Sequence, residues 1–189
     1  MNLPNKITMA RIVMVFIFLV ICNVDILIPD LYWRTIWRIV GFVFIIIAGL
    51  TDILDGYIAR KYDLVTDFGK LMDPLADKVF MVTAFIMLVH KQILPGGVAV
   101  VILTREFLVT GLRLLAANKG VVIAADITGK IKTLIQMLFL VFGASMWIGW
   151  IDIKYSQGWG WMIFYSSVAL LTVYSGGVYF FKNKELYIE

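Results

Sequence analysis

The strongest constraint on the fold is a series of long apolar segments that follow one another along the 189-residue chain. Each has about the 20 residues that an α-helix needs to cross the hydrocarbon core of a bilayer. Backbone polar groups in lipid must be bonded within the protein, which favours helices here. The sequence therefore predicts an all-α integral membrane protein, a single domain over residues 1–189, with six transmembrane helices at about 7–28, 36–60, 70–90, 94–117, 128–150 and 158–181.

Composition and charge agree with a membrane location and predict an orientation. The chain is 61% hydrophobic, with a mean hydropathy of +0.91, well beyond a soluble globular domain. All but four of its 17 lysine and arginine residues belong to one side of the predicted topology, the exceptions being Arg34, Arg38, Lys91 and Lys154. Because positive residues mark the cytoplasmic side, we expect both termini in the cytoplasm. The net charge of +4 is scattered over helix ends, which disfavours a nucleic-acid partner.

Four aspartates stand where the second predicted helix ends and the third begins. Asp52 and Asp55 are three residues apart, and Asp73 and Asp77 are four apart. On helices these spacings put each pair on one face, and a helical hairpin would bring the two pairs together. Carboxylates in apolar sequence need a neutralising cation, and oxygen ligands suit Mg²⁺ first, then Mn²⁺ or Ca²⁺. We therefore predict a site for two divalent ions that could assist displacement at a phosphorus atom.

Residues beside the aspartates indicate a phosphorylated substrate. Gly56 and Ala59 would expose backbone to a ligand, and Arg60 offers a planar fork that suits a phosphate. Asp77 could also accept the proton of an attacking hydroxyl group. The prediction is a metal-dependent site for phosphoryl chemistry at the cytoplasmic membrane surface.

The same stretch carries a motif of eight fixed positions, Asp52-x2-Asp55-Gly56-x2-Ala59-Arg60-x8-Gly69-x3-Asp73-x3-Asp77. This motif resembles the signature of the CDP-alcohol phosphotransferase family at every fixed position. The resemblance implies an enzyme that transfers a phospho-lipid group from a CDP-linked lipid to an alcohol and releases CMP. It also implies a homodimer, Asp77 as the base, and a CDP-lipid site formed by Asp55, Gly56, Ala59, Arg60 and Gly69.

The fourth predicted helix contains a pair of arginines. Arg105 and Arg113 are eight residues apart, close to two helical turns, so they share a face. Arginines inside an apolar helix indicate an anion site, and Lys130 from the next helix could join them. Two alternatives stay open at this stage. Glu106 could pair with one arginine in a purely internal ion pair, and Lys132 rather than Lys130 could point inward.

The strings Arg105-Glu106-Phe107 to Gly111-Leu112-Arg113 and Gly129-Lys130-Ile131-Lys132-Thr133 are similar to those of the bacterial phosphatidylglycerophosphate synthase branch of the family. This resemblance implies transfer from CDP-diacylglycerol to sn-glycerol 3-phosphate in the bacterial inner membrane, giving phosphatidylglycerol phosphate and CMP. One alternative is a sister enzyme that makes cardiolipin, phosphatidylserine or phosphatidylinositol phosphate. Another, from a different class, is a transporter that uses the aspartates as a cation pathway.

The N-terminus contains polar residues at helical spacing. Asn5 can cap the first helix, and Thr8 and Arg11 then lie on one face. They could simply anchor the helix at the interface, but a similar pattern in the resembling family borders the active site. We expect Asn5, Thr8 and Arg11 to border the site.

The last two predicted helices carry little that indicates chemistry. No charged residue lies between Thr133 and Trp150, or between Gly158 and Phe181. Both helices are therefore expected to be scaffold and to contact lipid.

Overall fold

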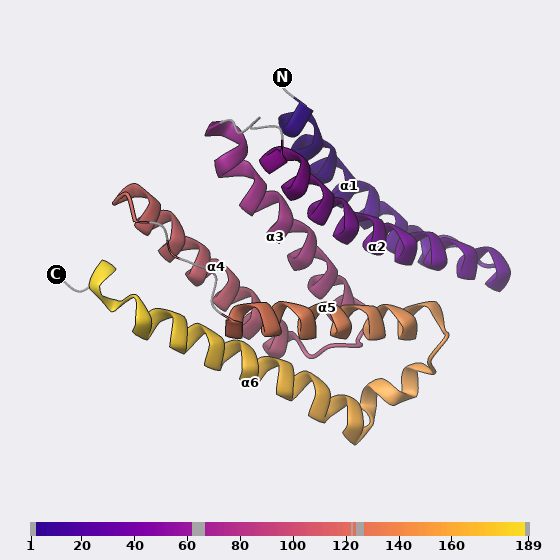
Figure 1. The fold of residues 1–189 in the computed structure, drawn as a ribbon. Coiled ribbons are helices and arrows are strands. Elements are labelled where there is room, and N and C mark those ends of the chain that lie inside the picture. The colour runs from indigo at the N-terminus through magenta and orange to yellow at the C-terminus, as the bar shows by residue number, and fades with distance from the viewer. Residues whose placement is uncertain (1–2, 62–66, 122, 124–126, 188–189) are drawn as a thin grey trace. The chain divides into compact units, whose positions relative to one another are not determined.

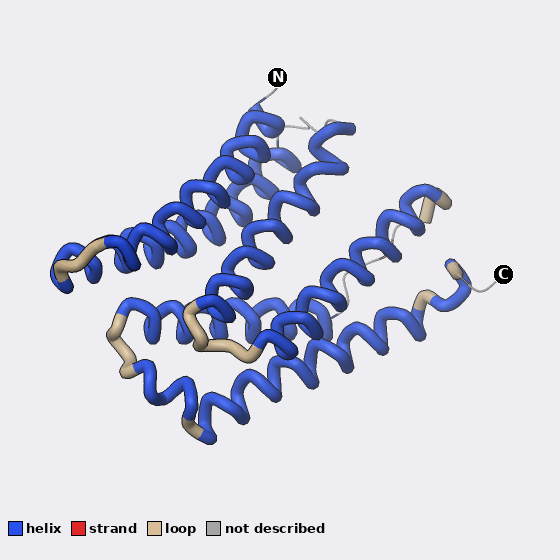
Figure 2. Tube along the Cα trace, turned by 180° about the vertical axis from the view of Figure 1, so that it is seen from behind, coloured by secondary structure: helices blue, strands red, loops and turns tan. Residues whose placement is uncertain are grey.

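The computed structural model describes residues 3–61, 67–121, 123 and 127–187. Side chains are described in these ranges except at 3–8, 11, 25, 48–61, 67–74, 76–77 and 118. Throughout the described residues the only regular structure is helical, which confirms the all-α prediction (Figure 2). The elements are α1 (Leu3–Leu27), α2 (Leu31–Lys61), α3 (Asp67–His90), α4 (Gly96–Asn118), α5 (Ile127–Ile148), the 3₁₀ turn η1 (Ile153–Gln157), α6 (Trp159–Lys182) and the 3₁₀ turn η2 (Lys184–Leu186).

Each predicted apolar segment contains one α-helix, and the ends differ by a few residues. The largest difference is at α2, which begins at Leu31 rather than at 36. Polar contacts around the α1–α2 turn accompany the earlier start. The Asp30 carboxylate accepts a hydrogen bond from the Trp33 backbone N–H at 3.1 Å, and the Ile28 carbonyl accepts two from the Arg34 guanidinium at 2.9 and 2.7 Å. The bond to Asp30 satisfies a backbone N–H that the start of α2 would otherwise leave unpaired, and the bonds from Arg34 satisfy a carbonyl just after the end of α1.

The chain divides into two compact units, of which the first contains Met1–Met87 and Trp147–Ile151. Here α1 and α2 pack against each other as a hairpin (Figure 1). The buried side chain of Phe18 in α1 also reaches α3, where its ring centroid lies 5.7 Å from that of Phe80. Cys22 is buried in the same unit as a free thiol. The core of this unit thus includes buried aromatic side chains from α1 and α3.

A glycine permits a close approach within the first unit. A Cβ atom at Gly41 would lie 2.7 Å from the Trp147 ring and 3.1 Å from the Ile21 side chain. One residue further along α2, the Phe42 ring meets Trp150 edge-on, with centroids 5.4 Å apart. Gly41 therefore gives Trp147 the space that any larger residue would fill.

The second unit contains Leu88–Met146 and Asp152–Glu189. In it α4 packs along α6, and the buried side chains of Val109, Leu112 and Tyr179 form a cluster between these helices. The buried Trp161 side chain joins further elements of the unit. Its indole N–H donates to the Ile93 carbonyl at 2.7 Å, and its ring stacks on Phe139 at 4.6 Å. The start of α6 is thereby held to the turn before α4 and to α5.

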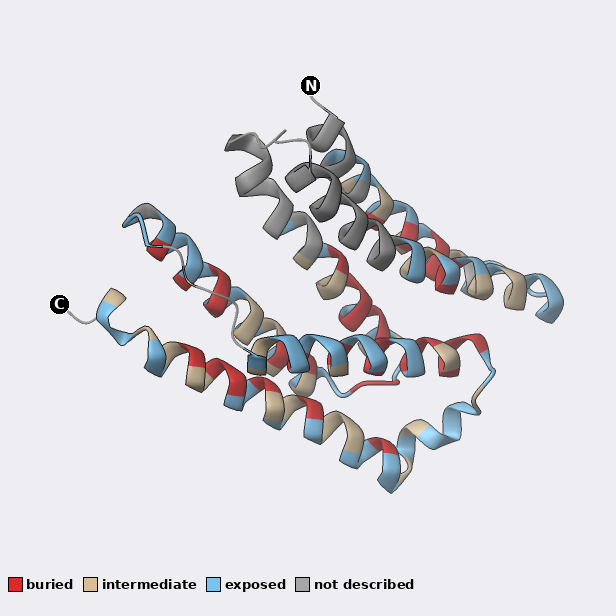
Figure 3. Cartoon of the chain, viewed as in Figure 1, coloured by how far each residue is buried: buried red, intermediate tan, exposed pale blue. Residues whose placement is uncertain are grey.

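Two helices of the described chain, α5 and α6, are long and apolar enough to cross a membrane. Both helices carry many exposed residues (Figure 3). Large apolar side chains are among them, for example Leu134, Leu170 and Phe181. In contrast, α4 carries Arg105, Glu106 and Arg113 within its length. The six-span topology, the cytoplasmic termini and the single-domain organisation stay predictions.

Candidate functional site

The eight motif positions all lie in helices, so their backbone spacing is the helical one on which the predicted metal site depends. The first five belong to the end of α2 and the last three to the start of α3. In a helix, residues three or four apart share a face, so each aspartate pair shares one. The side chains of this motif lie outside the described residues, and the metal and CDP-lipid contacts stay predictions for Asp52, Asp55, Gly56, Ala59, Arg60, Gly69, Asp73 and Asp77.

The N-terminal residues that are expected to border the site lie in α1. They are Asn5, Thr8 and Arg11, and their side chains are likewise outside the described residues. Among the side chains that the structure does describe, no group of three or more histidine, cysteine, aspartate or glutamate residues could hold a metal ion.

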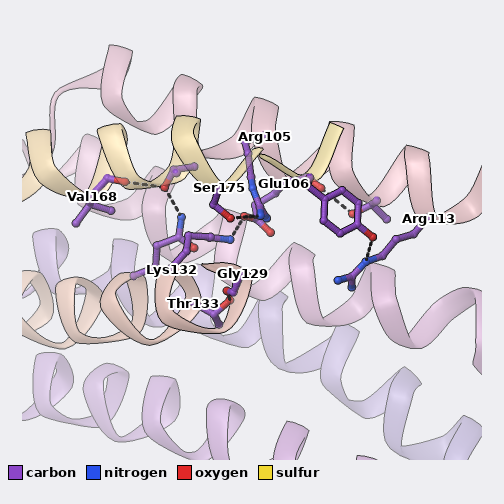
Figure 4. A network of polar contacts seen from close by, with 12 residues as sticks. Arg105, Glu106, Arg113, Gly129, Lys132, Thr133, Val168 and Ser175 are labelled. Atoms are coloured by element: carbon purple, nitrogen blue, oxygen red, sulfur yellow. Dashed lines mark hydrogen bonds and ion pairs between the residues drawn. The ribbon is translucent and has the colours of Figure 1, made fainter. Parts of the chain in front are cut away.

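Arg105 is held from both sides by hydrogen bonds. One terminal guanidinium nitrogen donates to the Ser175 hydroxyl of α6 at 2.8 Å, and the other lies 3.3 Å from the Glu106 carboxylate (Figure 4). The Arg105 side chain is 11% exposed, and its buried Nε has no hydrogen-bond partner within the described structure. Arg105 thus makes the internal ion pair with Glu106 and keeps a buried donor that is not satisfied. Its role in an anion site stays a prediction.

Glu106 also binds Lys132 of α5, whose ammonium group donates to the same carboxylate oxygen. The Lys132 side chain is only 2% exposed, whereas Lys130 lies on the exposed side of α5. Residues two apart on a helix point in very different directions, so only one of these lysines can face inward. In the second unit that lysine is Lys132. A role of Lys130 at the acceptor phosphate stays a prediction.

Arg113 makes its contact with a tyrosine of α6. Its Nε donates to the Tyr179 hydroxyl at 2.9 Å, and the centre of its guanidinium lies 5.5 Å from the centroid of the Tyr179 ring. Tyr179 is buried, but Arg113 is exposed. Since Nε carries one of the five N–H donors of a guanidinium, four remain on its terminal nitrogens. Arg113 therefore combines a fixed position with donors that a ligand could use.

A second buried polar pair lies close in sequence to Lys132. The Gln136 side-chain amide donates to the Thr172 hydroxyl at 3.1 Å, and both residues are completely buried. Thr172 in turn donates to the Val168 carbonyl of its own helix at 2.7 Å. Buried polar groups in apolar helices are costly unless they are paired. The interface of α5 and α6 is thus held partly by hydrogen bonds and not by apolar packing alone.

The network includes residues that the sequence did not indicate, chiefly Ser175, Tyr179 and Gln136. Single hydroxyl residues in apolar helices commonly bond to their own backbone, as Ser167 does to the Ile163 carbonyl at 2.7 Å. Nothing in the residue type distinguishes Ser175 from Ser167. Gln136 differs from the two hydroxyl residues, because an amide side chain inside an otherwise apolar helix requires a partner and so could have been found from the sequence.

A separate ion pair lies in the connection between α5 and α6. The Asp152 carboxylate accepts hydrogen bonds from the Lys154 side chain at 2.8 Å and from the Lys154 backbone N–H at 3.0 Å. The side-chain hydrogen bond from Lys154 is the main reason that the pKa of Asp152 is lowered, and the same bond raises the pKa of Lys154. Both side chains are exposed, so this pair contributes little to stability.

Fold and site together define a class of protein. The chain is all-helical in the described residues and has helices of membrane-spanning length. It carries paired aspartates where α2 ends and α3 begins, and buried cationic side chains between α4, α5 and α6. The chain belongs to the CDP-alcohol phosphatidyltransferase family, whose sequence model matches residues 1–173. It is therefore an enzyme, a transferase of phospholipid biosynthesis. The family generally uses divalent metal ions.

Curated relatives agree with this family. A protein of Bacillus subtilis (strain 168) is 46% identical over 145 residues, which cover 72% of this chain and 73% of that protein. A protein of Rickettsia typhi is 39% identical over 139 residues, 74% of each chain. Both are named CDP-diacylglycerol–glycerol-3-phosphate 3-phosphatidyltransferase. A protein of Mycobacterium tuberculosis (H37Rv) is 41% identical over 139 residues, which cover 71% of this chain and 62% of that protein. It is named a probable phosphatidylglycerophosphate synthase.

Proposed function

We propose that this enzyme transfers the phosphatidyl group of CDP-diacylglycerol to sn-glycerol 3-phosphate, giving phosphatidylglycerol phosphate and CMP. The names of the curated relatives carry this proposal, since the Bacillus subtilis and Rickettsia typhi proteins are both named for this transfer. The cationic network around α4 supports the choice of a phosphorylated acceptor, because arginine is the side chain best suited to bind a phosphate.

In the proposed reaction the 1-hydroxyl oxygen of glycerol 3-phosphate attacks the phosphorus that carries diacylglycerol. A new phosphorus–oxygen bond forms there, and the bond from that phosphorus to the oxygen shared with CMP breaks, so that CMP leaves with the bonding electron pair. The hydroxyl proton passes to the Asp77 carboxylate. A carboxylate is a weak base, so its effect depends on being held close to the hydroxyl group.

The donor set of the motif fits divalent cations. Asp52 and Asp55 of α2, with Asp73 and Asp77 of α3, supply only carboxylate oxygens, and the helical spacing puts each pair on one face. Oxygen ligands of this kind suit two Mg²⁺ ions, with Mn²⁺ as a substitute. When bound, such ions would neutralise negative charge on the diphosphate. The CDP group would lie against Asp55, Gly56, Ala59, Arg60 and Gly69, with Asn5, Thr8 and Arg11 at the border.

The acceptor phosphate would be bound by Arg105, Arg113 and Lys130. Arg113 supports this assignment best, because it is exposed and has four N–H donors beyond its bond to Tyr179. We expect Arg113→Ala to raise the KM for glycerol 3-phosphate while leaving the KM for CDP-diacylglycerol unchanged.

The proposed setting is the bacterial inner membrane, with six transmembrane helices, both termini in the cytoplasm, the active site on the cytoplasmic side and two chains per assembly. The apolar helices α5 and α6 and the distribution of lysine and arginine support this topology. Acyl chains of the lipid substrate would stay in the bilayer while its head group reacts.

An acceptor panel tests the proposal. Purified enzyme with Mg²⁺ and CDP-diacylglycerol in mixed micelles is given glycerol 3-phosphate, serine, phosphatidylglycerol or inositol phosphate, and CMP release is measured. We expect release with glycerol 3-phosphate. Release with another acceptor only would replace the proposal by a sister activity, and cation uptake into vesicles that contain no CDP-lipid would favour a transporter.

A further inference from the structure

Two residues of α6, one helical turn apart, each hold one of the α4 arginines. Ser175 accepts a hydrogen bond from Arg105 at 2.8 Å, and Tyr179 accepts one from Arg113 at 2.9 Å. Ser175 is 1% exposed and Tyr179 is 4% exposed, so both residues that accept these bonds are almost completely buried. Figure 4 shows Arg105 and Ser175 meeting next to Glu106, with Arg113 further along the same interface.

Packing fixes Tyr179 itself. Its ring lies in the cluster formed with Val109 and Leu112 of α4, and Phe180 and Leu186 pack against this cluster. Arg113 also lies 5.5 Å from the ring centroid, a distance at which a cation is attracted to an aromatic face. The Tyr179 hydroxyl is therefore presented at a fixed point, and the direction of the Arg113 side chain follows from it.

Gly176, next to Ser175, makes room for the other arginine. A Cβ atom at this position would lie 2.9 Å from Cγ of Arg105, in the stem of the side chain and not at its flexible end. At the next residue, Gly177, a Cβ atom would meet nothing within 4 Å. The path of Arg105 along α6 therefore requires glycine at 176 and tolerates a larger residue at 177.

These three α6 residues lie outside the family match, which ends at residue 173. We propose that Ser175, Gly176 and Tyr179 are positioning residues for the phosphate of the acceptor. They hold Arg105 and Arg113 in the orientation that binds a phosphate monoester, without touching the substrate themselves. This inference rests on the proposed function for its substrate and on the α4–α6 hydrogen bonds for its geometry.

Matched variants on the same helix test the proposal. Tyr179→Phe removes only the hydroxyl, and exposed Tyr174→Phe is its control. Gly176→Ala displaces Arg105, and Gly177→Ala is its control. Ser175→Ala removes the bond to Arg105, while Ser167→Ala removes a bond within its own helix. Each variant is compared with the wild-type enzyme at equal amounts of folded protein, measured by gel filtration in detergent.

We expect Tyr179→Phe and Ser175→Ala each to raise the KM for glycerol 3-phosphate about tenfold, as loss of a hydrogen bond to a charged group predicts. Gly176→Ala should raise the same KM because its Cβ displaces the stem of Arg105. The KM for CDP-diacylglycerol should stay within about twofold, and the three controls should match wild type. A purely structural role would lower kcat or the amount of folded protein and leave the ratio of the two KM values unchanged. That result, or an unchanged KM for glycerol 3-phosphate, would overturn the proposal.

A binding measurement separates this inference from the proposed function. Inorganic phosphate should raise the thermal unfolding midpoint of the detergent-solubilised wild type more than sodium chloride of equal ionic strength does. Tyr179→Phe should weaken this effect, and Tyr174→Phe should keep it. Wild-type enzyme that binds phosphate in this way but uses a different acceptor would contradict the proposed function alone. Failure of phosphate to stabilise the wild type, or equal stabilisation of both variants, would contradict the positioning role.

Discussion

Replacing Glu106 by glutamine should destabilise the second unit more than most single substitutions do. The Glu106 carboxylate pairs with the ammonium of Lys132 and lies 3.3 Å from a terminal nitrogen of Arg105. The side chains of Lys132 and Glu106 are 2% and 14% exposed, so solvent screens this pair very little. Glutamine has nearly the same shape but no charge, so it would leave the Lys132 ammonium buried without the carboxylate that it contacts now.

The size of the effect follows from this burial. Removing one partner of a buried ion pair costs about 3–5 kcal/mol. Because glutamine keeps one acceptor oxygen and Glu106 is slightly exposed, we expect the lower end, about 3 kcal/mol. Lys132→Met should cost less, about 1–2 kcal/mol, since Glu106 keeps Arg105. Replacing both charges by neutral groups of similar size is often close to neutral. Because Arg105 would also lose its carboxylate, the double variant should cost about 1–2 kcal/mol, less than the sum of the single changes.

The assay is equilibrium unfolding of the four proteins in mixed micelles, followed by circular dichroism during titration with a denaturing detergent. The four free energies of unfolding form a double-mutant cycle, and we expect Glu106 and Lys132 to be coupled by at least about 2 kcal/mol. Additive effects, or a Glu106→Gln protein within about 1 kcal/mol of wild type, would refute the buried pair. The exposed pair of Asp152 and Lys154 serves as a control, and its loss should not change unfolding measurably.

Two further predictions concern packing. Gly41→Ala should lower the free energy of unfolding by about 1–3 kcal/mol, because its Cβ would meet the rigid Trp147 ring at 2.7 Å. Gly111→Ala is the control, since a Cβ there would meet nothing within 4 Å, and it should leave stability unchanged or raise it by up to about 1 kcal/mol. The same unfolding titration compares the two variants. Trp161→Phe should lower the free energy of unfolding by about 1–3 kcal/mol, since it leaves the Ile93 carbonyl without the indole N–H that donates to it at 2.7 Å. A decrease below about 0.5 kcal/mol in that titration would contradict this role for the hydrogen bond.

The helices could be predicted closely because apolar length and local polar residues determine them. The predicted segment 128–150 corresponds to Ile127–Ile148, and 158–181 corresponds to Trp159–Lys182. The early start of α2 does not follow from the apolar pattern because its N-cap, Asp30, lies before the apolar run. The bond from Arg34 back to the Ile28 carbonyl, six residues earlier, likewise leaves no simple pattern in the sequence.

The polar network could be predicted only in part. The charges of Arg105 and Arg113 in an apolar helix indicate an anion site, and the sequence places Glu106 next to Arg105 as an ion-pair partner. The bond of Glu106 to Lys132 could not be predicted, because it depends on how α5 is rotated about its axis. Lys130 and Lys132 are equivalent by residue type, and only packing places Lys132 inside. Ser175 and Tyr179 gave no signal because the sequence cannot show which helix a hydroxyl group will face.

The most direct test of the central claim is CMP release by the Asp77→Asn enzyme in vesicles that contain CDP-diacylglycerol, with Mg²⁺ and glycerol 3-phosphate. Asp63→Asn, a change of the same chemistry outside the motif, is the control. We predict that Asp77→Asn lowers turnover by roughly two to four orders of magnitude, the usual contribution of a general base, while CDP-lipid binding persists and the control matches wild type. Wild-type turnover by Asp77→Asn would contradict the proposed mechanism.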